Sequence, residues 1–505
     1  MLSKSRYLAG RQCAKRLWIE LHRRELVPPV NEETQAIFDQ GHEVGRLAQQ
    51  LFPGGIEIVR ERFDWAGAVA ATREALARRL PIYEAAFVHG GAGCRVDILA
   101  PAGDGSGESE GRSEGESEGA WDLYEVKSGT SPKDENFEDV ALQAWIVREA
   151  GLALRKTFLV HLDSSYVRRG ELELDRLLRR VDVGGEVEAR APLMPGRVAE
   201  LLRVAARETE PDIAIGPHCR SPRPCPLVPH CWRELPAENV LDLRHGGQKA
   251  WRLLGEGITE LKSIPDTVEL SSRQRIQVAA ARSGEAHVDR AAVGSFLGRL
   301  DYPRYFLDFE TYAPAAPPFD DTRAYGQIPF QFSLHVVEKA GAAPRASAWL
   351  APDGADPRRG FLEALRRELG EMEAPGSIVA YNVKFERDCL AECAALFPGH
   401  GEWAARAGGR FVDLLQPFES FAYHHPAQRG SASLKAVLPV LGERGYDHLA
   451  IQDGRAAARA FQRSNLASTP PEARASIRQG LLDYCGRDTE GIVEIVAALE
   501  RLAGA

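Results

Sequence analysis

The sequence lacks any long uncharged apolar run. Within its 505 residues, none approaches the roughly 18 apolar residues that a membrane-spanning helix needs. The first residues, MLSKSRYLAGRQCAKRLW, have neither an apolar core nor a small-residue cleavage site, so they do not resemble a signal peptide. We therefore expect a cytoplasmic protein with no membrane partner. The composition, 44% hydrophobic and 27% charged, excludes a disordered or fibrous chain, and the length predicts two to four domains.

The sequence also has no excess of basic residues. The chain has 63 basic and 72 acidic residues and a net charge of −9, whereas nucleic-acid-binding proteins are usually basic. Residues 101–120, PAGDGSGESEGRSEGESEGA, contain six acids and one arginine, and so supply more than half of this deficit. Such a Gly/Ser/Glu-rich segment cannot bury apolar surface, which predicts a disordered acidic insert. The average charge therefore does not exclude a nucleic-acid partner.

Lysine is scarce, with ten lysines against 53 arginines, and one of the ten belongs to a first group of charged residues. Glu125 and Lys127 are two residues apart on a predicted strand, so both side chains point to the same face. Asp97 lies on the predicted partner strand of the same hairpin. Two carboxylates and one ammonium suit a hard cation, Mg²⁺ or Mn²⁺, and phosphodiester hydrolysis. Alternating charges on a solvated strand would look the same, so spacing alone leaves both interpretations open.

Around these residues the chain resembles the RecB-like branch of the PD-(D/E)XK nucleases, especially the CRISPR-associated exonucleases that contain an iron–sulfur cluster. The match extends over residues 1–235, in motif order. Asp97 matches the acidic motif, and Glu125 and Lys127 match the ExK motif. The resemblance implies that Asp97 and Glu125 bind the metal ion and that all three residues are catalytic.

Two further matches lie on predicted helices. Residues 3–24 and 32–51 show helical periodicity, with Ser3 as an N-cap, and His42 on the second helix matches the family's metal-binding histidine. Gln143 matches the Gln-x3-Tyr helix, where the resemblance implies a supporting role, although residue 147 is valine rather than tyrosine. A lone helical histidine is equally typical of a surface residue.

The eight cysteines do not form the pattern of a disulfide framework. Three of them are separated from one another by five residues in a proline-rich segment, a wider spacing than the C-x2–4-C pairs of structural zinc sites. Four thiolates hold [4Fe–4S] clusters with varied spacings. In the resembled nucleases, one cysteine before the nuclease motifs and three after them bind such a cluster, and the corresponding residues here are Cys13, Cys219, Cys225 and Cys231. Zinc is the alternative, since His218 and His230 are neighbours of these cysteines, and unliganded core thiols are the third interpretation.

A second acidic group lies in the C-terminal part of the chain. Asp308 and Glu310 share one face of an apolar predicted strand. Buried acids are costly unless a positive charge neutralises them, and a metal ion is the simplest such charge. Further on, Glu386 follows Asn382 at a predicted junction between a strand and a helix.

The last acid of this group, Asp488, lies four residues after Tyr484, so the two share one face of a predicted helix over about 475–502. This order of motifs resembles the DEDD superfamily of 3′–5′ exonucleases on an RNase H-like fold, although the second motif usually ends in Asp rather than Glu. The matched residues are Asp308, Glu310, Asn382, Glu386, Tyr484 and Asp488. The resemblance implies that the four carboxylates bind two cations about 4 Å apart. It also implies that the tyrosine orients or helps to deprotonate the attacking water.

Two of the scarce lysines, Lys384 and Lys435, lie inside these motif segments and would contact phosphates or be surface residues. The segments 327–332 and 433–435 are similar to a bacterial family in which a RecB-like domain precedes a DEDD-like domain.

Together these patterns predict an α/β protein with three parts. They are a RecB-like PD-(D/E)XK nuclease domain over 1–235, a helical connector over 236–300 and an RNase H-like DEDD exonuclease domain over 301–505. We expect a metal-dependent nuclease acting on DNA, in repair or end processing. Two alternatives stay open: an RNA-processing exoribonuclease, and an iron–sulfur nucleic-acid-binding scaffold with one inactive nuclease site.

Overall fold

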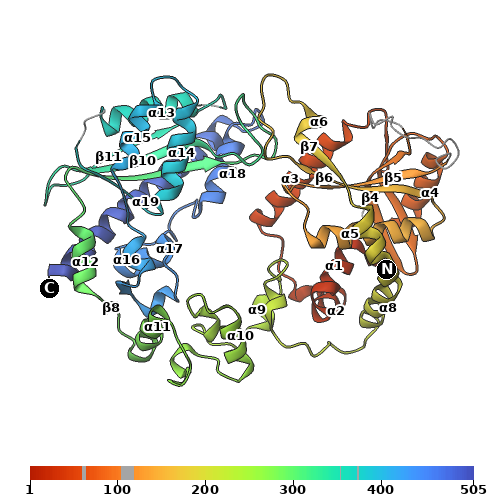
Figure 1. Cartoon of the computed structure of the whole chain (residues 1–505), viewed down its shortest axis with the longest axis horizontal. Helices are drawn as coiled ribbons and strands as arrows, with labels where there is room; N and C mark the ends of the chain where they lie inside the picture. Colours follow the sequence, from red (N-terminus) through yellow and green to blue (C-terminus); the bar gives the residue numbers. More distant parts are fainter. Residues whose placement is uncertain (60–63, 104–118, 353, 372–374, 505) are drawn as a thin grey trace. The chain divides into compact units, whose positions relative to one another are not determined.

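The computed structural model shows a mixed α/β protein of two compact units (Figure 1). The structure describes residues 1–59, 64–103, 119–352, 354–371 and 375–504. The first unit comprises Met1–Glu234 and Pro314–Gly326, and the second comprises Leu235–Ala313 and Gln327–Ala505. Most of the predicted acidic insert, residues 104–118, lies outside the described residues. No helix in the described ranges is both long and apolar enough to cross a membrane.

The units divide the chain differently from the predicted domains in two places. Residues 236–300 belong to the second unit instead of standing apart as a connector, and Pro314–Gly326 belongs to the first unit. The physical reason for the second difference is burial. Ala315 and Ala324 are 1% and 3% exposed and pack in a core of the first unit.

Polar contacts fix the same segment in the first unit. The Arg168 guanidinium donates hydrogen bonds to the carbonyls of Pro317 and Pro318, at 3.0 and 2.9 Å. The Tyr325 hydroxyl donates to the carbonyl of Ser128, next to the predicted catalytic lysine. The segment is therefore an integral part of the first unit.

The first unit is built on a seven-stranded mixed sheet, in the order β2-β3-β4-β5-β6-β7 with β1 paired to β4. Its main elements are β1 (Leu2–Ser3), α1 (Lys4–Gln12), α2 (Ala14–His22), α3 (Glu32–Gln49), β2 (Ile56–Glu57), α4 (Trp65–Leu76), β3 (Ile82–His89), β4 (Ala92–Pro101), β5 (Trp121–Lys127), α5 (Asp134–Glu149), β6 (Leu154–Leu162), α6 (Leu174–Leu177), β7 (Leu178–Asp182), α7 (Gly184–Arg190), α8 (Met194–Ala205) and α9 (Val228–Cys231). The predicted hairpin is confirmed, because β4 and β5 are antiparallel neighbours.

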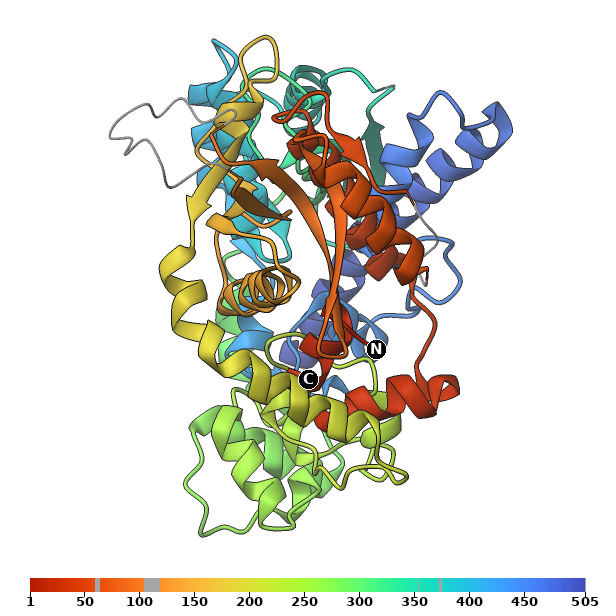
Figure 2. The same ribbon diagram turned by 90° about the vertical axis from the view of Figure 1, so that its right-hand side faces the viewer.

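Two helices cover the faces of this sheet. β5 and β6 are parallel, and α5 makes the crossover between them and packs on one face (Figure 2). Helix α3 packs on the opposite face through Val44 and Ala48. Leu123 packs on the α5 side and Tyr124 on the α3 side. Alternation along β5 therefore points Glu125 and Lys127 toward α5.

The N-terminal helical prediction holds with one difference. Ser3 is the N-cap of α1, and its side chain accepts a hydrogen bond from the Arg6 amide. The helix predicted over 3–24 is broken at Cys13, whose backbone is extended, so α1 and α2 are separate helices. This break lies at one of the four predicted cluster ligands.

The second unit contains a five-stranded mixed sheet, in the order β11-β10-β9-β12-β13. Its main elements are α10 (Gly247–Gly255), α11 (Ser272–Ser283), β8 (His287–Val288), α12 (Arg290–Leu297), β9 (Arg304–Tyr312), β10 (Ile328–Val337), β11 (Arg345–Leu350), α13 (Arg358–Leu369), β12 (Ser377–Ala380), α14 (Val383–Ala395), α15 (Gly401–Gly409), β13 (Phe411–Asp413), α16 (Gln416–Glu419), β14 (Tyr423–His424), α17 (Leu434–Leu441), α18 (Gly454–Ser464) and α19 (Pro471–Gly504).

The direction of strand addition reverses at β9 in this second sheet. The chain adds β10 and β11 on one side, both antiparallel to their neighbours, and then β12 and β13 on the other, parallel to β9. Ligands of open α/β sheets bind at such a switch point, beyond the carboxyl ends of the strands. Figure 1 shows α13 and α14 on one side of the sheet and α19 on the other. Leu307 and Phe309 pack with α13, so the residues between and after them face α19.

Candidate active and metal-binding sites

Four carboxylates predicted from the sequence come together in the second unit. Asp308 and Glu310 lie on β9, Glu386 lies in the first turn of α14, and Asp488 lies on α19. Glu310, Glu386 and Asp488 are 5%, 2% and 5% exposed, and Asp308 is half-buried. Three separate elements thus bring four acids to the switch point of the sheet.

Burial and mutual repulsion raise the pKa values of these acids, because little positive charge lies nearby. Burial, followed by repulsion from the neighbouring carboxylates, raises the pKa of Asp308 and that of Glu310 well above the usual range. Burial raises the pKa of Glu386 to about 8 and that of Asp488 to about 6. Lys435 lowers the pKa of Glu310 and that of Asp488, but does not offset burial. A bound cation would supply the missing charge.

The donor atoms fit a hard divalent cation. Glu386 Oε2 is buried and has no hydrogen-bond partner in the described part of the chain. Among the described residues, no hydrogen bond or ion pair reaches the Glu310 carboxylate either. Unpartnered buried carboxylate oxygens are costly by themselves and are the ligands that Mg²⁺ and Mn²⁺ prefer.

Two tyrosines contact Asp488. The predicted Tyr484 lies one helical turn away on α19, and Tyr446, which no motif indicated, donates a hydrogen bond from its hydroxyl to Asp488 Oδ1. Both hydroxyls lower the pKa of Asp488 and so oppose the effect of burial. Tyr446 precedes α18 in an irregular loop, where residue spacing has no fixed structural meaning. A polar pocket of about 340 Å³ adjoins it, lined by residues that include Lys435, Arg444, Tyr446, Asp447 and Gln452.

Asn382 shapes the turn between β12 and α14. It has a left-handed backbone with φ of 71°, which asparagine tolerates better than most residues. Its backbone amide donates to Asp413 Oδ1 at 2.9 Å. The residue therefore positions the helix that contains Glu386, and its own side chain makes no hydrogen bond to the four acids among the described residues.

The two motif lysines of this unit differ in environment. Lys384 forms an exposed ion pair with Asp388 one turn further along α14, as the surface interpretation expects. Lys435 is exposed at the rim of the pocket next to Tyr446, donates to the Gln452 carbonyl at 2.6 Å, and acts electrostatically on the acidic group.

The first unit also gathers its predicted residues, and adds two that the sequence analysis missed. Lys127 pairs with Glu125 and, at 2.7 Å, with Asp139 Oδ2. Lys4, the first residue of α1, pairs with Glu125 Oε1 at 2.7 Å. Gln143 Nε2 donates to Glu125 Oε2 at 2.7 Å and to Asp139 Oδ1 at 3.0 Å. Asp139 lies four residues before Gln143 on α5, so their spacing would have indicated a shared face.

The charges at this first site are already balanced in part. Burial alone would raise the pKa of Glu125, but Lys127 and Lys4 outweigh it and hold that pKa below the usual range. Burial and the charge of Glu125 raise the pKa of Asp97 to about 7, and Asp97 Oδ2 accepts a hydrogen bond from the Val126 amide at 2.7 Å. The predicted three residues thus lie together, but both oxygens of Glu125 already have donors.

His42 and Glu84 differ in their relation to this site. His42 is exposed on α3, and within the described ranges it has no hydrogen bond or ion pair with Asp97 or Glu125. Glu84 lies in the middle of β3 with a left-handed φ of 58°, and interacts electrostatically with Lys4 and Glu125. Strained backbone of this kind is found preferentially at functional sites.

The four predicted cluster ligands line one small pocket of the first unit, together with His218, Lys15 and Arg16. Gln12, next to Cys13, holds the cysteine-rich loop by donating to the carbonyls of His218 and Arg223, at 2.8 and 2.7 Å. The ring of His230 instead lies against Arg233.

The four sulfurs are not preassembled as a tight metal site. Among the described residues, no three of them lie within 4.8 Å of one another. They line one pocket, and four thiolates are the ligand set of either a [4Fe–4S] cluster or a structural zinc ion.

These features define a mixed α/β protein of two units with two buried acidic groups and a four-cysteine pocket. A family model described as Domain of unknown function (DUF2779) matches residues 305–433. The matched range contains Asp308, Glu310 and Glu386, but ends before Tyr484 and Asp488. No curated protein gives a significant match to the chain.

Proposed function

We propose that this protein is a metal-dependent nuclease whose second unit is an RNase H-like, DEDD-type 3′–5′ exonuclease. One observation supports this most strongly. Four carboxylates from three elements converge at the switch point of the sheet, and buried oxygens of Glu310 and Glu386 have no partner among the described residues. Bound divalent cations would polarise the phosphodiester and activate the attacking water.

The residues around the acids have separate tasks in this proposal. Burial and the neighbouring acids raise the pKa of Tyr484, so its hydroxyl keeps its proton and positions water or phosphate as a hydrogen-bond donor. Lys435 is exposed beside the acidic group and provides a charge-assisted contact for a phosphate oxygen.

In the first unit we propose a RecB-like nuclease site with a [4Fe–4S] cluster at the four cysteines. Four thiolates around a cluster leave a net negative charge, and Lys15 and Arg16 at the same pocket offset it. The Gln12 contacts join the single early cysteine to the late ones, which is what a ligand set drawn from both ends of a unit requires.

The hydrogen bonds of Glu125 support a second candidate function. Glu125 Oε1 accepts from both Lys4 and Lys127, and Oε2 accepts from Gln143. A cation at Glu125 must therefore compete with these donors, the Lys4 ammonium among them, whereas the second unit has unpartnered carboxylate oxygens. This difference favours the second unit as the one that cuts nucleic acid. The first unit would then bind nucleic acid, or cut it only when Lys4 is released.

The substrate proposed is DNA in the bacterial or archaeal cytoplasm, in repair or end processing, and this step rests on analogy with the resembled nucleases. An RNA substrate is the competing outcome, since the tyrosine-type DEDD fold serves both polymers.

The test is a nuclease assay on end-labelled DNA and RNA with Mn²⁺, Mg²⁺ or EDTA. We expect Asp308→Asn to lower exonuclease activity at least about a hundredfold, while the exposed control Asp388→Asn retains it. Lys127→Ala, with the exposed control Lys156→Ala, reports on the first unit. Activity that survives both Asp308→Asn and Lys127→Ala would refute the proposal, and loss with only one of them identifies the cutting unit.

A further inference from the structure

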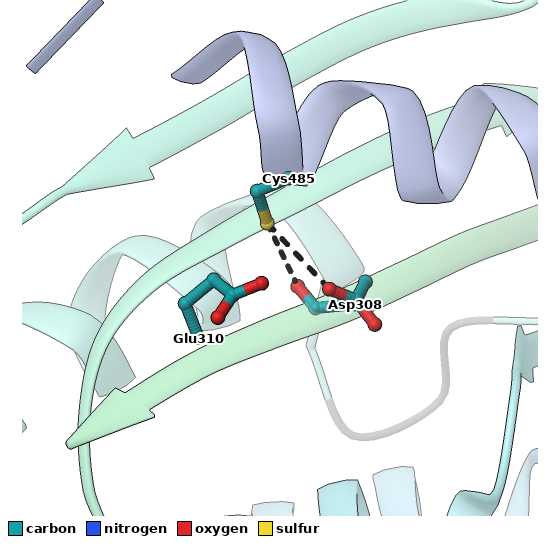
Figure 3. A group of neighbouring side chains, drawn as sticks. All are labelled: Asp308, Glu310 and Cys485. Atoms are coloured by element: carbon teal, nitrogen blue, oxygen red, sulfur yellow. Dashed lines mark hydrogen bonds between the residues drawn. The ribbon is translucent and has the colours of Figure 1, made fainter. Parts of the chain in front are cut away.

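A thiol lies inside the acidic group of the second unit. Cys485 follows Tyr484 on α19 and points toward Asp308 and Glu310 on β9 (Figure 3). Its Sγ is 3.7 Å from Asp308 Oδ2 and 3.8 Å from the Asp308 carbonyl oxygen. The sulfur and one oxygen from each carboxylate lie within 4.8 Å of one another.

The surroundings of these three groups point to a ligand. Cys485 is fully buried, and Glu310, 5% exposed, has no hydrogen bond or ion pair among the described residues. The thiol gives the one hydrogen bond that the Asp308 side chain has among the described residues. A carboxylate without a donor in a buried position is ionised at low cost only when a positive charge lies nearby.

The donor set selects among cations. Mg²⁺ takes oxygen ligands and gains nothing from sulfur. Thiolate ligands instead favour softer or borderline ions such as Zn²⁺ and Co²⁺, which also bind carboxylates. A zinc-like ion in this arrangement can therefore bind the sulfur as well as the two oxygens. A hard ion such as Mg²⁺ would use only the two oxygens.

We propose that Asp308, Glu310 and Cys485 form a binding site for a thiophilic divalent cation, Zn²⁺ in particular, which competes with the activating Mg²⁺ or Mn²⁺. Binding forms one metal–sulfur and two metal–oxygen bonds, and the thiol proton passes to solvent, with no change of oxidation state. Zn–S and Zn–O bonds of about 2.3 and 2.1 Å place such ligand atoms roughly 3.5 Å apart, so small side-chain rotations close the site. The site itself does not require nuclease activity, and only its inhibitory consequence rests on the proposed function.

Cobalt is the probe, because a Co²⁺–thiolate bond gives a near-ultraviolet charge-transfer band. The full-length protein is titrated with Co²⁺ as wild type, Cys485→Ser and Cys393→Ser. Cys393 is the matched control, since it is also buried in the second unit but donates to the Arg358 carbonyl. We expect the wild-type spectrum to exceed that of Cys485→Ser by one thiolate band, and Cys393→Ser to keep that band. The four cysteines of the first unit contribute equally to all three spectra.

Two further measurements distinguish failure of the proposed cation site from failure of the proposed nuclease function. Zn²⁺ inhibition, expressed relative to each variant's own activity with Mn²⁺, is expected to require at least about tenfold more Zn²⁺ in Cys485→Ser. Circular dichroism checks folding, and Cys485→Ala replaces the serine variant if that one fails to fold. Equal cobalt spectra for wild type and folded Cys485 variants would overturn the inference, even if Asp308→Asn abolishes nuclease activity. A Cys485-dependent band in a protein with no nuclease activity would uphold the site and reject the proposed function.

Discussion

Glu386 and Asp488 release their protons at a higher pH than ordinary carboxyl groups do. Burial raises their pKa values to about 8 and about 6, whereas in an unfolded chain both titrate near 4. Between about pH 4 and 8 the folded, metal-free protein therefore binds more protons than the unfolded chain, so these groups destabilise the folded state progressively as pH rises. Bound cations reverse this effect by favouring the ionised carboxylates.

The corresponding prediction concerns thermal unfolding. In EDTA, we expect the Tm of Glu386→Gln to rise relative to wild type as pH increases from 5 to 8, because glutamine has no proton to lose. Mn²⁺ should raise the wild-type Tm more at pH 8 than at pH 5. Scanning calorimetry at both pH values, with Asp388→Asn as the exposed control, measures both effects. A Tm difference that is independent of pH would show that Glu386 titrates normally.

Tyr446 gives a second prediction at the residue scale. Its hydroxyl donates to Asp488 Oδ1 and lowers the pKa of that carboxyl, so Tyr446→Phe should weaken cation binding. A hydrogen bond to a charged group contributes about 1.5–3 kcal/mol, which corresponds to about a 10- to 100-fold increase in the Mn²⁺ concentration needed for activity. Tyr423→Phe is the control, since Tyr423 on β14 is also buried but makes no hydrogen bond to these acids among the described residues. An unchanged Mn²⁺ dependence in Tyr446→Phe would contradict the assigned role.

At the scale of elements, regular patterns were predictable and irregular connections were not. The apolar strand around Asp308 and the helix around Tyr484 were both found from residue periodicity, because burial on one face imposes that periodicity. Lys4 and Tyr446 were not predicted, because neither matches a motif of the resembled nucleases and neither is near its partner along the chain. Only tertiary packing brings such residues into a site.

The break between α1 and α2 leads to a prediction for the cysteine pocket. Gln12 ends α1 and donates two hydrogen bonds to the loop that contains Cys219, so Gln12→Ala should loosen that loop by about 1–2 kcal/mol. If the pocket holds an iron–sulfur cluster, wild-type protein is brown, and the variant loses its visible absorbance several-fold faster in air. The exposed Gln50→Ala is the control. Colourless wild-type protein with stoichiometric zinc would rule out the cluster.

At the scale of the whole molecule, the sequence indicated a division near residue 235, and the structure divides the chain after Glu234. The sequence did not indicate that Pro314–Gly326 belongs to the first unit. That segment has neither helical nor strand periodicity, and its two buried alanines are too small and too few to reveal which core they enter.

Ala324→Asp tests this assignment. A carboxylate placed at this buried position has no cation to pair with, so we expect the first unit to lose at least about 3 kcal/mol of stability. The exposed Ala343→Asp, in the turn between β10 and β11, should have no such effect. Calorimetry of the full chain follows the change, with Asp308→Asn as a reference for unfolding of the second unit. The assignment fails if Ala324→Asp leaves the unfolding of the first unit unaltered.

The path of the chain through Pro314–Gly326 also constrains how this protein can be divided. Because each unit is assembled from two separate stretches of sequence, no single break in the gene releases both units whole. A fragment ending at Glu234 would lack part of its own core, and its complement would keep thirteen residues that belong elsewhere. Separating the two units experimentally therefore requires Pro314–Gly326 to be grafted onto the first unit rather than a simple truncation.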